Sequence, residues 1–487
     1  MENTMGILSS LKPKKVFEYF ELLSSVPHGS GNTKQISDIC VDFAKKLGLE
    51  YYQDELNNVV IIKPATEGYE NSAPLIMQGH LDMVCTKDED CQIDMATEPI
   101  KLTVDGDWVR AIGTSLGGDN IIAVAMIMAV LDSSDLSHPR IEAVFTVDEE
   151  TGMDGAMGLD VTPLRGRMML NLDSEEDGVL TCGCAGGARV DCALSARRET
   201  LPNGFTAAKI VISGLQGGHS GVDIDKCHAS SNQLMGRLLY NLARSTDLRL
   251  VEMWGGKLDN VIPLYTESVI AFPASDYSKI EKLAAEFSDK FKFEYSTAEP
   301  GMEITFEKCD TAEKAVTKED TDTMLFTLLT VPYGVEAMSM DIKGLVQTSL
   351  NLGVLKLNEN ELNFSFATRS SILSQKEMLV QRITAILERV GGTATVRSSY
   401  PGWAYRKDSL LRDTIASAYK DQTGKDSVIS ATHGGLECGL FIEKLPGLDC
   451  VSIGPDLRDV HSTRERLSIS STARLWDLVC EVLKRLK

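Results

Sequence analysis

Histidine and carboxylate side chains recur where apolar segments of the sequence end. In Pro74-Leu-Ile-Met-Gln-Gly-His-Leu-Asp-Met-Val84, His80 and Asp82 follow an apolar run that is typical of a buried strand in a parallel sheet. Open α/β sheets place their chemistry beyond the carboxyl ends of such strands. His80 could bind a metal ion while Asp82 orients or charges its surroundings. Further candidates at strand ends, in a Gly-rich loop and near the C-terminus are Asp119, Glu149, Glu150, Asp173 and His461.

This set of side chains suits a pair of divalent metal ions. Two imidazoles and three carboxylates can hold two ions if one carboxylate bridges both. Mixed histidine and carboxylate ligation fits Zn²⁺, Mn²⁺ or Co²⁺ better than Ca²⁺ or Mg²⁺. Two such ions can polarise a carbonyl and generate hydroxide at neutral pH. The Glu149–Glu150 pair can give one carboxylate to a metal and leave its neighbour free as the general base.

Each candidate also has an ordinary structural explanation. Asp119 could cap the helix that follows it, and Glu149–Glu150 could be a solvated strand exit. Asp173 could belong to a surface acidic run, and His461 taken alone could be structural. Because all of these explanations would have to hold together, we favour the two-metal site.

Strand and helix patterns alternate at both ends of the chain, which predicts an α/β sheet with largely parallel pairing, flanked by helices. The expected helices are 13–23, 33–47, 121–131, 410–419 and 471–486, and the expected strands are 59–62, 75–78, 141–147, 168–172 and 448–454.

The middle of the chain has a different order of elements, which indicates an α+β insert. It contains two β-α-β-β-α-β patterns of the ferredoxin-like type, the first with an extra leading strand. The expected strands are 189–194, 208–213, 249–254, 268–272, 292–295, 303–306, 347–357, 361–368 and 393–397, and the expected helices are 227–242, 278–287, 320–329 and 376–390. We therefore predict one α/β domain, formed by residues 1–186 and 401–487, that is interrupted by an insert at residues 187–400.

Composition limits the partners and the compartment. The 487 residues include 49 basic and 70 acidic side chains, a net charge of −21, which disfavours nucleic acid or an anionic membrane as a partner. No stretch approaches the ~20 apolar residues of a membrane span. The N-terminal residues 1–10 lack the features of a secretory signal, so the 11 cysteines indicate reduced thiols in the cytoplasm. Cys182 and Cys184 could be ligands, although small buried residues in a Gly-rich turn explain them better.

Four motifs resemble the M20 metallopeptidase family, and the resemblance extends over the whole chain. They are Gln78-Gly-His-Leu-Asp-Met, Gly113-Thr-Ser-Leu-Gly-Gly-Asp-Asn, Thr146-Val-Asp-Glu-Glu-Thr-Gly and Asn171-Leu-Asp-Ser-Glu-Glu. Within the family, Met153-Asp-Gly-Ala-Met-Gly-Leu and Cys182-Gly-Cys-Ala-Gly-Gly resemble the bacterial aminoacyl-histidine dipeptidases. The resemblance implies a catalytic α/β domain and an inserted lid domain.

The resemblance also implies a role for each candidate residue. The implied metal ligands are Asp119 as the bridge, His80 and Asp173 on one ion, and Glu150 and His461 on the other. Glu149 is the implied general base, and Asp82 would orient His80 and tune its metal. Asn120 stands where many family members have a second Asp.

Substrate contacts are implied in the insert and in a late Gly-rich loop, Thr432-His-Gly-Gly-Leu-Glu-Cys-Gly439. His219 resembles a lid histidine that reaches a catalytic centre across a dimer interface, where it would steady the oxyanion; alternatively, it is exposed in a Gly-rich turn. Arg369 could pair with a terminal carboxylate or form a structural salt bridge. The remaining implied contacts are Asn260, whose amide would touch the substrate, Gly434 and Gly435, which would let the backbone approach the peptide, and His433 and Glu437 as specificity contacts.

Taken together, the resemblance implies a cytosolic dipeptidase with two divalent ions, Zn²⁺ foremost and Mn²⁺ or Co²⁺ as alternatives. It would hydrolyse Xaa-His and related dipeptides such as β-Ala-His or Cys-Gly, and it would be a homodimer through the lid. One alternative is another M20 reaction, either tripeptide cleavage or deacylation of an N-acyl amino acid. The other is a metal- or peptide-binding protein without activity on the same scaffold.

Overall fold

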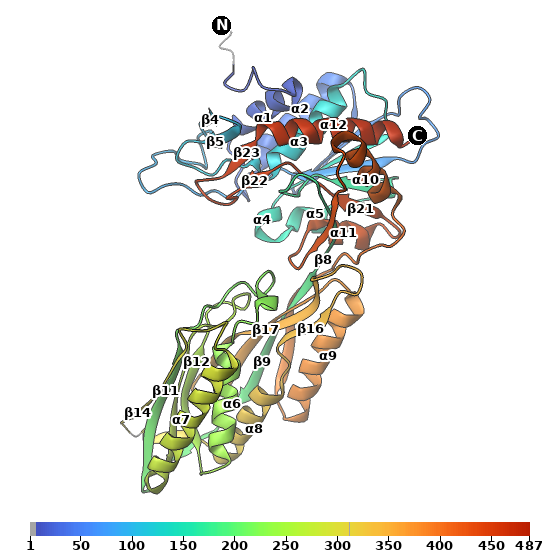
Figure 1. The fold of residues 1–487 in the computed structure, drawn as a ribbon. Coiled ribbons are helices and arrows are strands. Elements are labelled where there is room, and N and C mark those ends of the chain that lie inside the picture. Colours follow the sequence, from blue (N-terminus) through green and yellow to red (C-terminus); the bar gives the residue numbers. More distant parts are fainter. Residues whose placement is uncertain (1–5, 311) are drawn as a thin grey trace. The chain divides into compact units, whose positions relative to one another are not determined.

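The computed structural model describes residues 6–310 and 312–487. The prediction that residues 1–10 lack a secretory signal falls partly on residues 1–5, which lie outside the described residues. The described chain forms two compact units (Figure 1). Unit 1 contains the residues up to Gly183, together with Tyr405–Ala431 and Glu437–Lys487, and unit 2 contains Cys184–Ala404 and Thr432–Leu436. The short segment 432–436 therefore groups with unit 2, whereas the predicted division 1–186, 187–400 and 401–487 placed it with the last segment.

Unit 1 is built on a mixed eight-stranded sheet with the order β1-β2-β6-β3-β7-β21-β8-β20. Its central pairs β6–β3, β3–β7 and β7–β21 are parallel. The central strands are buried over their whole length, as expected for a parallel sheet covered on both faces. The strands are β1 (Glu50–Gln53), β2 (Val59–Lys63), β3 (Leu75–His80), β6 (Ile141–Thr146), β7 (Met168–Asn171), β8 (Val179–Cys184), β20 (Val428–Thr432) and β21 (Asp449–Ser452).

Helices pack on this sheet and on one another. α3 is apolar on every side and packs between β3 and α1, so its side chains from Ile121 to Leu131 are buried. α10 packs against β7, β21 and α12. The helices of unit 1 are α1 (Lys14–Ser24), α2 (Lys34–Leu47), α3 (Gly118–Asp132), α4 (Glu149–Gly152), α5 (Asp154–Gly158), α10 (Leu410–Thr423), α11 (Glu437–Lys444) and α12 (Ile469–Arg485). The predicted mixed α/β sheet flanked by helices is confirmed.

A second, small sheet in unit 1 has the order β22-β23-β5-β4. It joins distant parts of the chain through the antiparallel pair β23–β5, in which Arg466 lies opposite Arg110. Its strands are β4 (Leu102–Asp105), β5 (Trp108–Ala111), β22 (Leu457–Arg458) and β23 (Arg466–Ser468). The loop after β5 leads to α3, and the loop between β22 and β23 carries His461.

Unit 2 is built on one antiparallel sheet with the order β14-β11-β13-β12-β17-β18-β9-β19, and β16 adds to β17. Its long strands are β9 (Gly186–Ser195), β11 (Phe205–Ser213), β12 (Arg249–Gly255), β13 (Thr266–Pro273), β14 (Glu303–Cys309), β16 (Gly334–Met338), β17 (Val346–Leu357), β18 (Glu361–Ser370) and β19 (Thr393–Tyr400). A separate short pair joins β10 (Arg198–Thr200) to β15 (Lys314–Val316).

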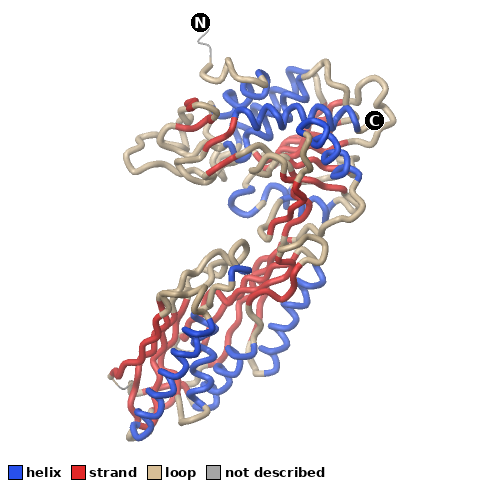
Figure 2. Tube along the Cα trace, viewed as in Figure 1, coloured by secondary structure: helices blue, strands red, loops and turns tan. Residues whose placement is uncertain are grey.

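Two ferredoxin-like halves are present, as expected, but two strands belong to other halves than predicted: 303–306, predicted to open the second half, closes the first as part of β14, and 189–194, predicted to lead the first half, opens the second as part of β9. One half is therefore nested in the other. The first half is β11-α6-β12-β13-α7-β14, and the second is β9 followed, after the whole first half, by α8-β17-β18-α9-β19. The halves meet where Trp254 pairs with Lys356 and Gly255 with Leu355. Helices α6 (Ser231–Ala243), α7 (Tyr277–Glu294), α8 (Lys318–Thr330) and α9 (Leu373–Arg389) pack on this sheet (Figures 1 and 2).

One predicted strand is wrong. The sequence predicts a strand over residues 292–295, where Phe293 and Tyr295 alternate with polar residues. In the structure α7 continues to Glu294, with Phe291 buried in the core and Phe293 83% exposed. The alternation at these aromatic residues thus belongs to the last turns of a helix, and the edge strand of this half is β14.

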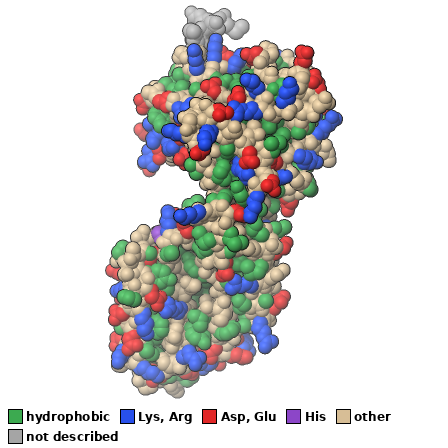
Figure 3. Space-filling view, turned by 45° about the vertical axis from the view of Figure 1, so that its right-hand side comes forward, with side chains coloured by type: hydrophobic (Ala, Val, Ile, Leu, Met, Phe, Trp, Pro, Cys, Tyr) green, Lys and Arg blue, Asp and Glu red, His purple; other side chains and the backbone are tan. Residues whose placement is uncertain are grey.

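The described residues contain no helix that is long and apolar enough to cross a membrane. On the face drawn in Figure 3, acidic and basic side chains are interspersed over each unit.

Candidate metal centre and a second polar cluster

Three neighbouring parallel strands bring candidate ligands to one edge of the unit 1 sheet. β3 lies between β6 and β7, and its last residue, His80, pairs with Thr146 at the end of β6. Asp173 follows the end of β7, and Glu149 begins α4 shortly after β6. Because parallel strands end at the same edge, these side chains lie close together, as the sequence predicts.

The first donor group contains His80, Asp119 and Asp173, whose ligand atoms lie within 4.8 Å of one another. His80 Nε2 is 3.4 Å from Asp119 Oδ1 and 3.5 Å from Asp173 Oδ1. Asp119 has a non-helical backbone at the start of α3, so it precedes the regular part of the helix. One imidazole and two carboxylates therefore face a common point, which is a three-ligand arrangement that a divalent ion accepts.

The second donor group contains Asp119, Glu150 and His461. His461 Nε2 is 3.0 Å from Glu150 Oε1 and 3.4 Å from Asp119 Oδ2. His461 lies in the β22–β23 loop with a left-handed backbone, φ +61°. Asp119 thus turns one carboxylate oxygen toward each imidazole, which is the arrangement that a bridging ligand requires.

The charges in this centre favour added cations. Burial disfavours charge on His80, yet the nearby carboxylates, Asp173 foremost, raise the pKa of its imidazole well above the ordinary value. Hydrogen bonds with Asp119 and then Glu150 raise the pKa of His461 to about 10. Burial raises the pKa of the Asp173 carboxyl to about 7. Two divalent ions would supply the positive charge that this centre attracts and leave both imidazoles neutral as ligands, so the donor set fits a two-metal site.

Glu149 differs from its neighbour Glu150 in its contacts. Its carboxylate joins a donor group with His80 and Glu150, but among the residues that the structure describes it makes no hydrogen bond. Burial, reinforced by nearby carboxylates such as Asp173, raises the pKa of Glu149 well above its ordinary value. An untethered carboxyl that holds a proton readily has the properties of a general base, the role predicted for Glu149.

Asp82 contacts both sides of the centre. Its Oδ1 lies 3.4 Å from His80 Nδ1 and accepts the Glu149 N–H at 3.1 Å, while the imidazole Nδ1 also lies 3.0 Å from the Asp82 carbonyl oxygen. Asp82 Oδ2 accepts from Ser30 Oγ at 2.8 Å and from the Glu150 N–H at 3.3 Å. Asp82 therefore holds the first turn of α4 as well as the ring of His80.

Asn120, the residue after Asp119, uses both ends of its amide. Its Oδ1 accepts the His80 N–H at 3.1 Å, and its Nδ2 donates to the Leu172 carbonyl at 2.9 Å. The side chain thus joins the ends of β3 and β7, and an ionised Asp could not make the second bond.

A buried row of polar side chains crosses the sheet behind the ligands. Asn171 Nδ2 donates to Gln78 Oε1 at 2.5 Å, and Gln78 Nε2 donates to Glu437 Oε2 at 2.6 Å. Thr146 Oγ1 donates to the same Glu437 oxygen at 2.7 Å. Glu437 is fully buried, and burial raises its pKa to about 7. Glu437, predicted to be a specificity contact, therefore lies behind the strand ends. There it accepts hydrogen bonds from Gln78 and Thr146, which lie close to the candidate site residues in the sequence.

Ser30 and Glu465 support the site but were not predicted from the sequence. Glu465 accepts backbone N–H groups from the loop that carries Asp119. Its position in His461-Ser-Thr-Arg-Glu465, close to a candidate ligand, was the one available signal. The pairing of β23 with β5, which brings Glu465 to that loop, has no signature in the sequence.

Unit 2 contains a second polar cluster, centred on Arg369. The guanidinium is buried, and burial lowers its pKa. Its nearest polar contacts are the Tyr400 hydroxyl at 3.5 Å, the His433 carbonyl at 3.4 Å and His219 Nε2 at 3.4 Å. Within the described part of the chain no carboxylate forms a salt bridge with Arg369, so the structural salt bridge considered above is absent there.

His219 and Asn260 lie on neighbouring loops of unit 2. His219 Nδ1 lies 3.3 Å from the N–H groups of Gly221 and Val222, and its Nε2 lies 3.4 Å from the Arg369 guanidinium, so both ring nitrogens face hydrogen-bond donors. Burial, followed by the charge of Arg369, lowers the pKa of His219. Asn260 accepts the Ser220 N–H at 2.8 Å through its carbonyl oxygen, so the two loops are joined.

The segment 432–436 adds His433 to this cluster. His433 Nε2 lies 2.7 Å from Ser349 Oγ, and burial, followed by the charges of Arg369 and His219, lowers its pKa to about 3. The Gly434 N–H bonds to Thr432 Oγ1 at 3.0 Å. His219, Asn260, Arg369, His433, Gly434 and Gly435 all belong to unit 2, whereas Glu437 belongs to unit 1. Their contacts with substrate stay a prediction.

Comparison with known proteins identifies the family. The sequence matches the family described as Peptidase family M20/M25/M40 over residues 76–485. This chain belongs to that family. The predictions of the M20 family and of a peptidase are therefore confirmed.

Two relatives resemble the chain over its whole length. The cytosol non-specific dipeptidase of Escherichia coli (strain K12) is 36% identical over 482 residues, which cover 99% of this chain and 99% of that protein. The crystal structure of aminoacylhistidine dipeptidase from Vibrio alginolyticus is 35% identical with a TM-score of 0.95, covering 100% of this chain and 99% of that one. The aminopeptidase PepT of Bacillus cereus ATCC 10987 shares the fold. Its structure has a TM-score of 0.56 and is 15% identical in sequence, covering 98% of this chain and 99% of that one.

Proposed function

We propose that this M20 peptidase is a cytosolic dipeptidase that uses two divalent metal ions, Zn²⁺ foremost, to hydrolyse Xaa-His and related dipeptides such as β-Ala-His or Cys-Gly. The observation that carries the proposal is the carboxylate of Asp119, whose two oxygens each lie 3.4 Å from a different imidazole. The two relatives that match the whole chain, a cytosol non-specific dipeptidase and an aminoacylhistidine dipeptidase, support the substrate class and the compartment.

The residues present would hold the ions in two overlapping sets. Asp119 would be shared, with His80 and Asp173 on one side and Glu150 and His461 on the other. When bound, the ions would polarise the scissile carbonyl and acidify a water molecule.

Glu149 would move the proton in this reaction. Its carboxylate would take a proton from the attacking water and return it to the amine of the leaving residue. The raised pKa of Glu149, caused chiefly by burial, suits a group that must hold this proton between the two steps. Asp82 would keep Glu149 in place through the Glu149 N–H while it orients His80.

The unit 2 cluster would recognise the peptide. Arg369 would bind the terminal carboxylate, because its guanidinium is buried with no carboxylate partner within the described chain. His219 would donate from Nε2 to the developing oxyanion. Asn260, His433, Gly434 and Gly435 would line the bound peptide.

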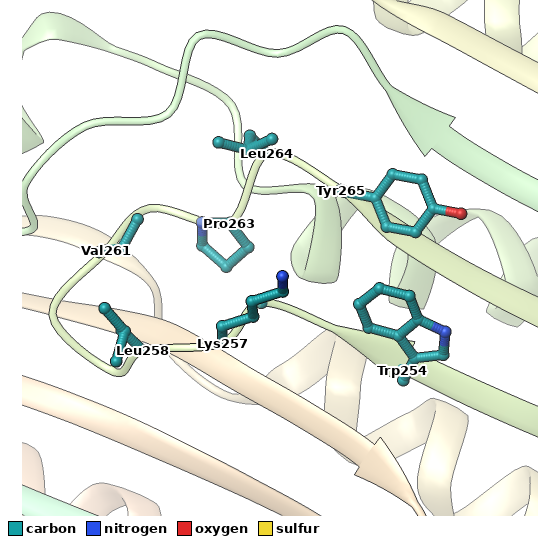
Figure 4. A pocket seen from close by; sticks show the side chains of 8 residues that line it. Trp254, Lys257, Leu258, Val261, Pro263, Leu264 and Tyr265 are labelled. Carbon is teal, nitrogen blue, oxygen red and sulfur yellow. The ribbon is translucent and has the colours of Figure 1, made fainter.

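We also propose that the protein is a homodimer through unit 2. A cavity of about 620 Å³ opens among apolar side chains next to the Asn260 loop, and Trp254, Leu258 and Leu264 are 38%, 60% and 46% exposed there (Figure 4). Clustered exposed apolar side chains are typical of interaction surfaces. Sedimentation of a Leu258→Lys, Leu264→Lys variant should show monomers where the unmodified protein is dimeric; unchanged dimers would place the interface elsewhere.

A substrate panel tests the proposed function. Protein stripped with a chelator should be inactive and should regain hydrolysis of β-Ala-His and other Xaa-His dipeptides with Zn²⁺, Mn²⁺ or Co²⁺. Preferential cleavage of tripeptides or N-acetyl amino acids would instead favour another M20 reaction. Absence of hydrolysis by metal-loaded protein across the panel would support a binding protein without activity.

A further inference from the structure

Glu465 is a buried carboxylate that organises the loop leading to the bridging ligand. Its Oε2 accepts the N–H groups of Leu116 at 2.8 Å and Gly117 at 3.0 Å, and its Oε1 accepts the Asp119 N–H at 3.3 Å. The side chain is 3% exposed, so these bonds compete little with water. The backbone on both sides of Gly118 is therefore held by one carboxylate.

The pairing of two distant segments places Glu465 at this loop. Glu465 immediately precedes β23, and β5 ends just before the loop. Because Arg466 of β23 lies opposite Arg110 of β5, the two ends meet. The β22–β23 loop that ends at Glu465 also carries His461, and the Glu465 N–H bonds to the Ser462 carbonyl at 3.1 Å.

The glycines of the loop allow this close approach. Gly117 has a left-handed backbone, φ +68°, which L-residues adopt at a cost. A Cβ atom on Gly118 would lie 2.8 Å from Leu457 Cδ2 and 3.2 Å from Glu465 Oε1. The loop is thus shaped to wrap around the Glu465 carboxylate.

We infer that Glu465 is a positioning residue that holds the bridging carboxylate of Asp119, and so serves both metal ions at once. Its carboxylate belongs to none of the donor groups found among the described residues, so it acts through Asp119 and is no ligand itself. The inference rests on the proposed function, because it assumes that Asp119 bridges two ions. Loss of partners that orient metal ligands typically costs about 10- to 100-fold in metal affinity.

Unit 1 offers a matched control in Glu142. This carboxylate is also fully buried, and its Oε2 accepts two backbone N–H groups, those of Arg165 and Gly166, both at 2.9 Å. It lies near the start of β6, whereas the candidate ligands follow the end of that strand. Glu142→Ala removes the same kind of cradle without touching a loop that carries a ligand.

The test is equilibrium dialysis of the full chain against Zn²⁺ buffered by a chelator, with bound zinc counted by mass spectrometry. Unmodified protein should bind two ions, and Glu465→Ala should bind both about 10- to 100-fold more weakly. Glu142→Ala should bind both as the unmodified protein does. His461→Ala should weaken one ion much more than the other.

Glu465→Gln keeps the test decisive if the alanine variant does not fold, as judged by circular dichroism. Its amide oxygen can still accept from Leu116 and Gly117, but its NH₂ group would face the Asp119 N–H, so an intermediate loss at both ions is expected. Wild-type affinity at both ions in the folded Glu465 variants, or a loss confined to one ion, would overturn the inference. Absence of zinc binding by the unmodified protein would instead refute the proposed two-metal function.

Discussion

The two polar clusters of the molecule concentrate opposite charges. In unit 1, carboxylates crowd around two imidazoles, and they raise the pKa of His80 and His461. In unit 2, the buried Arg369 lies among neutral groups, and the pKa of His219 and His433 is lowered. The first cluster has an excess of negative charge, and the second has a buried positive charge without a carboxylate partner among the described residues. This difference supports the proposal that the first cluster holds metal ions and the second recognises the end of a peptide.

The largest expected effect isolates chemistry from metal binding in unit 1. Glu149→Ala should lower kcat by about 10²- to 10⁴-fold, the range of general acid–base catalysis, because the variant lacks the proposed proton carrier. Its zinc content should stay at two ions, since Glu149 is assigned no metal. Steady-state kinetics with zinc analysis checks both parts, and near-normal turnover with bound zinc would refute the role of Glu149.

A second variant isolates recognition in unit 2. Arg369→Met should lower kcat/KM for a dipeptide with a free terminal carboxylate by about 10- to 100-fold, since a charged hydrogen bond contributes ~1.5–3 kcal/mol. The same dipeptide with an amidated terminus should be cleaved equally by both proteins. Equal losses on the two substrates would show that Arg369 has a structural role instead.

A matched pair of amide side chains compares how the two clusters are held. Asn120 joins His80 to Leu172 in unit 1, and Asn351 Nδ2 donates to the carbonyls on both sides of Asn260, each at 2.8 Å. Each Asn→Asp change loses a buried donor and should lower the free energy of unfolding by ~1–3 kcal/mol in urea titrations. Only Asn120→Asp should weaken zinc binding, and only Asn351→Asp should raise KM. If Asn120→Asp raised KM without weakening zinc binding, or Asn351→Asp weakened zinc binding, the separate roles of the two clusters would be contradicted.

The smallest expected effect is the acid sensitivity of His433. Its folded pKa of about 3 lies below the ordinary value of 6.5, so the neutral ring stabilises the fold fully above pH 6.5. This contribution is lost as the pH falls from 6.5 toward 3, by at most ~1.4 kcal/mol per pH unit. The stability of His433→Asn should therefore fall less steeply over pH 6.5–5 than that of the unmodified protein, both free of metal. Parallel slopes in urea titrations would contradict the burial of a neutral His433.

Three of the candidate site residues follow a local signal in the sequence. His80, Glu149 and Asp173 come directly after apolar strands, and parallel strands bring such positions together regardless of the loops between them. Asp119 and His461 lie in loops, and the motif resemblance was needed to assign their roles. The main strands and helices followed from periodicity for the same local reason.

The supporting contacts could not be predicted because they depend on long-range pairing. The pair β23–β5 places Glu465 at the Asp119 loop, and its strands are short and partly exposed. The nesting of one ferredoxin-like half inside the other likewise depends on β9 pairing with strands far along the chain. The position of Glu437 could not be predicted either, because its burial behind Gln78 and Thr146 depends on how distant segments pack.

The central claim is that Asp119 is shared by two metal ions. Crystals of the zinc-loaded protein, measured with anomalous scattering at the zinc edge, test it most directly. We expect two zinc peaks, with one oxygen of Asp119 bound to each, His80 and Asp173 on the first ion, and Glu150 and His461 on the second. A single peak, or two peaks that do not share Asp119, would contradict it.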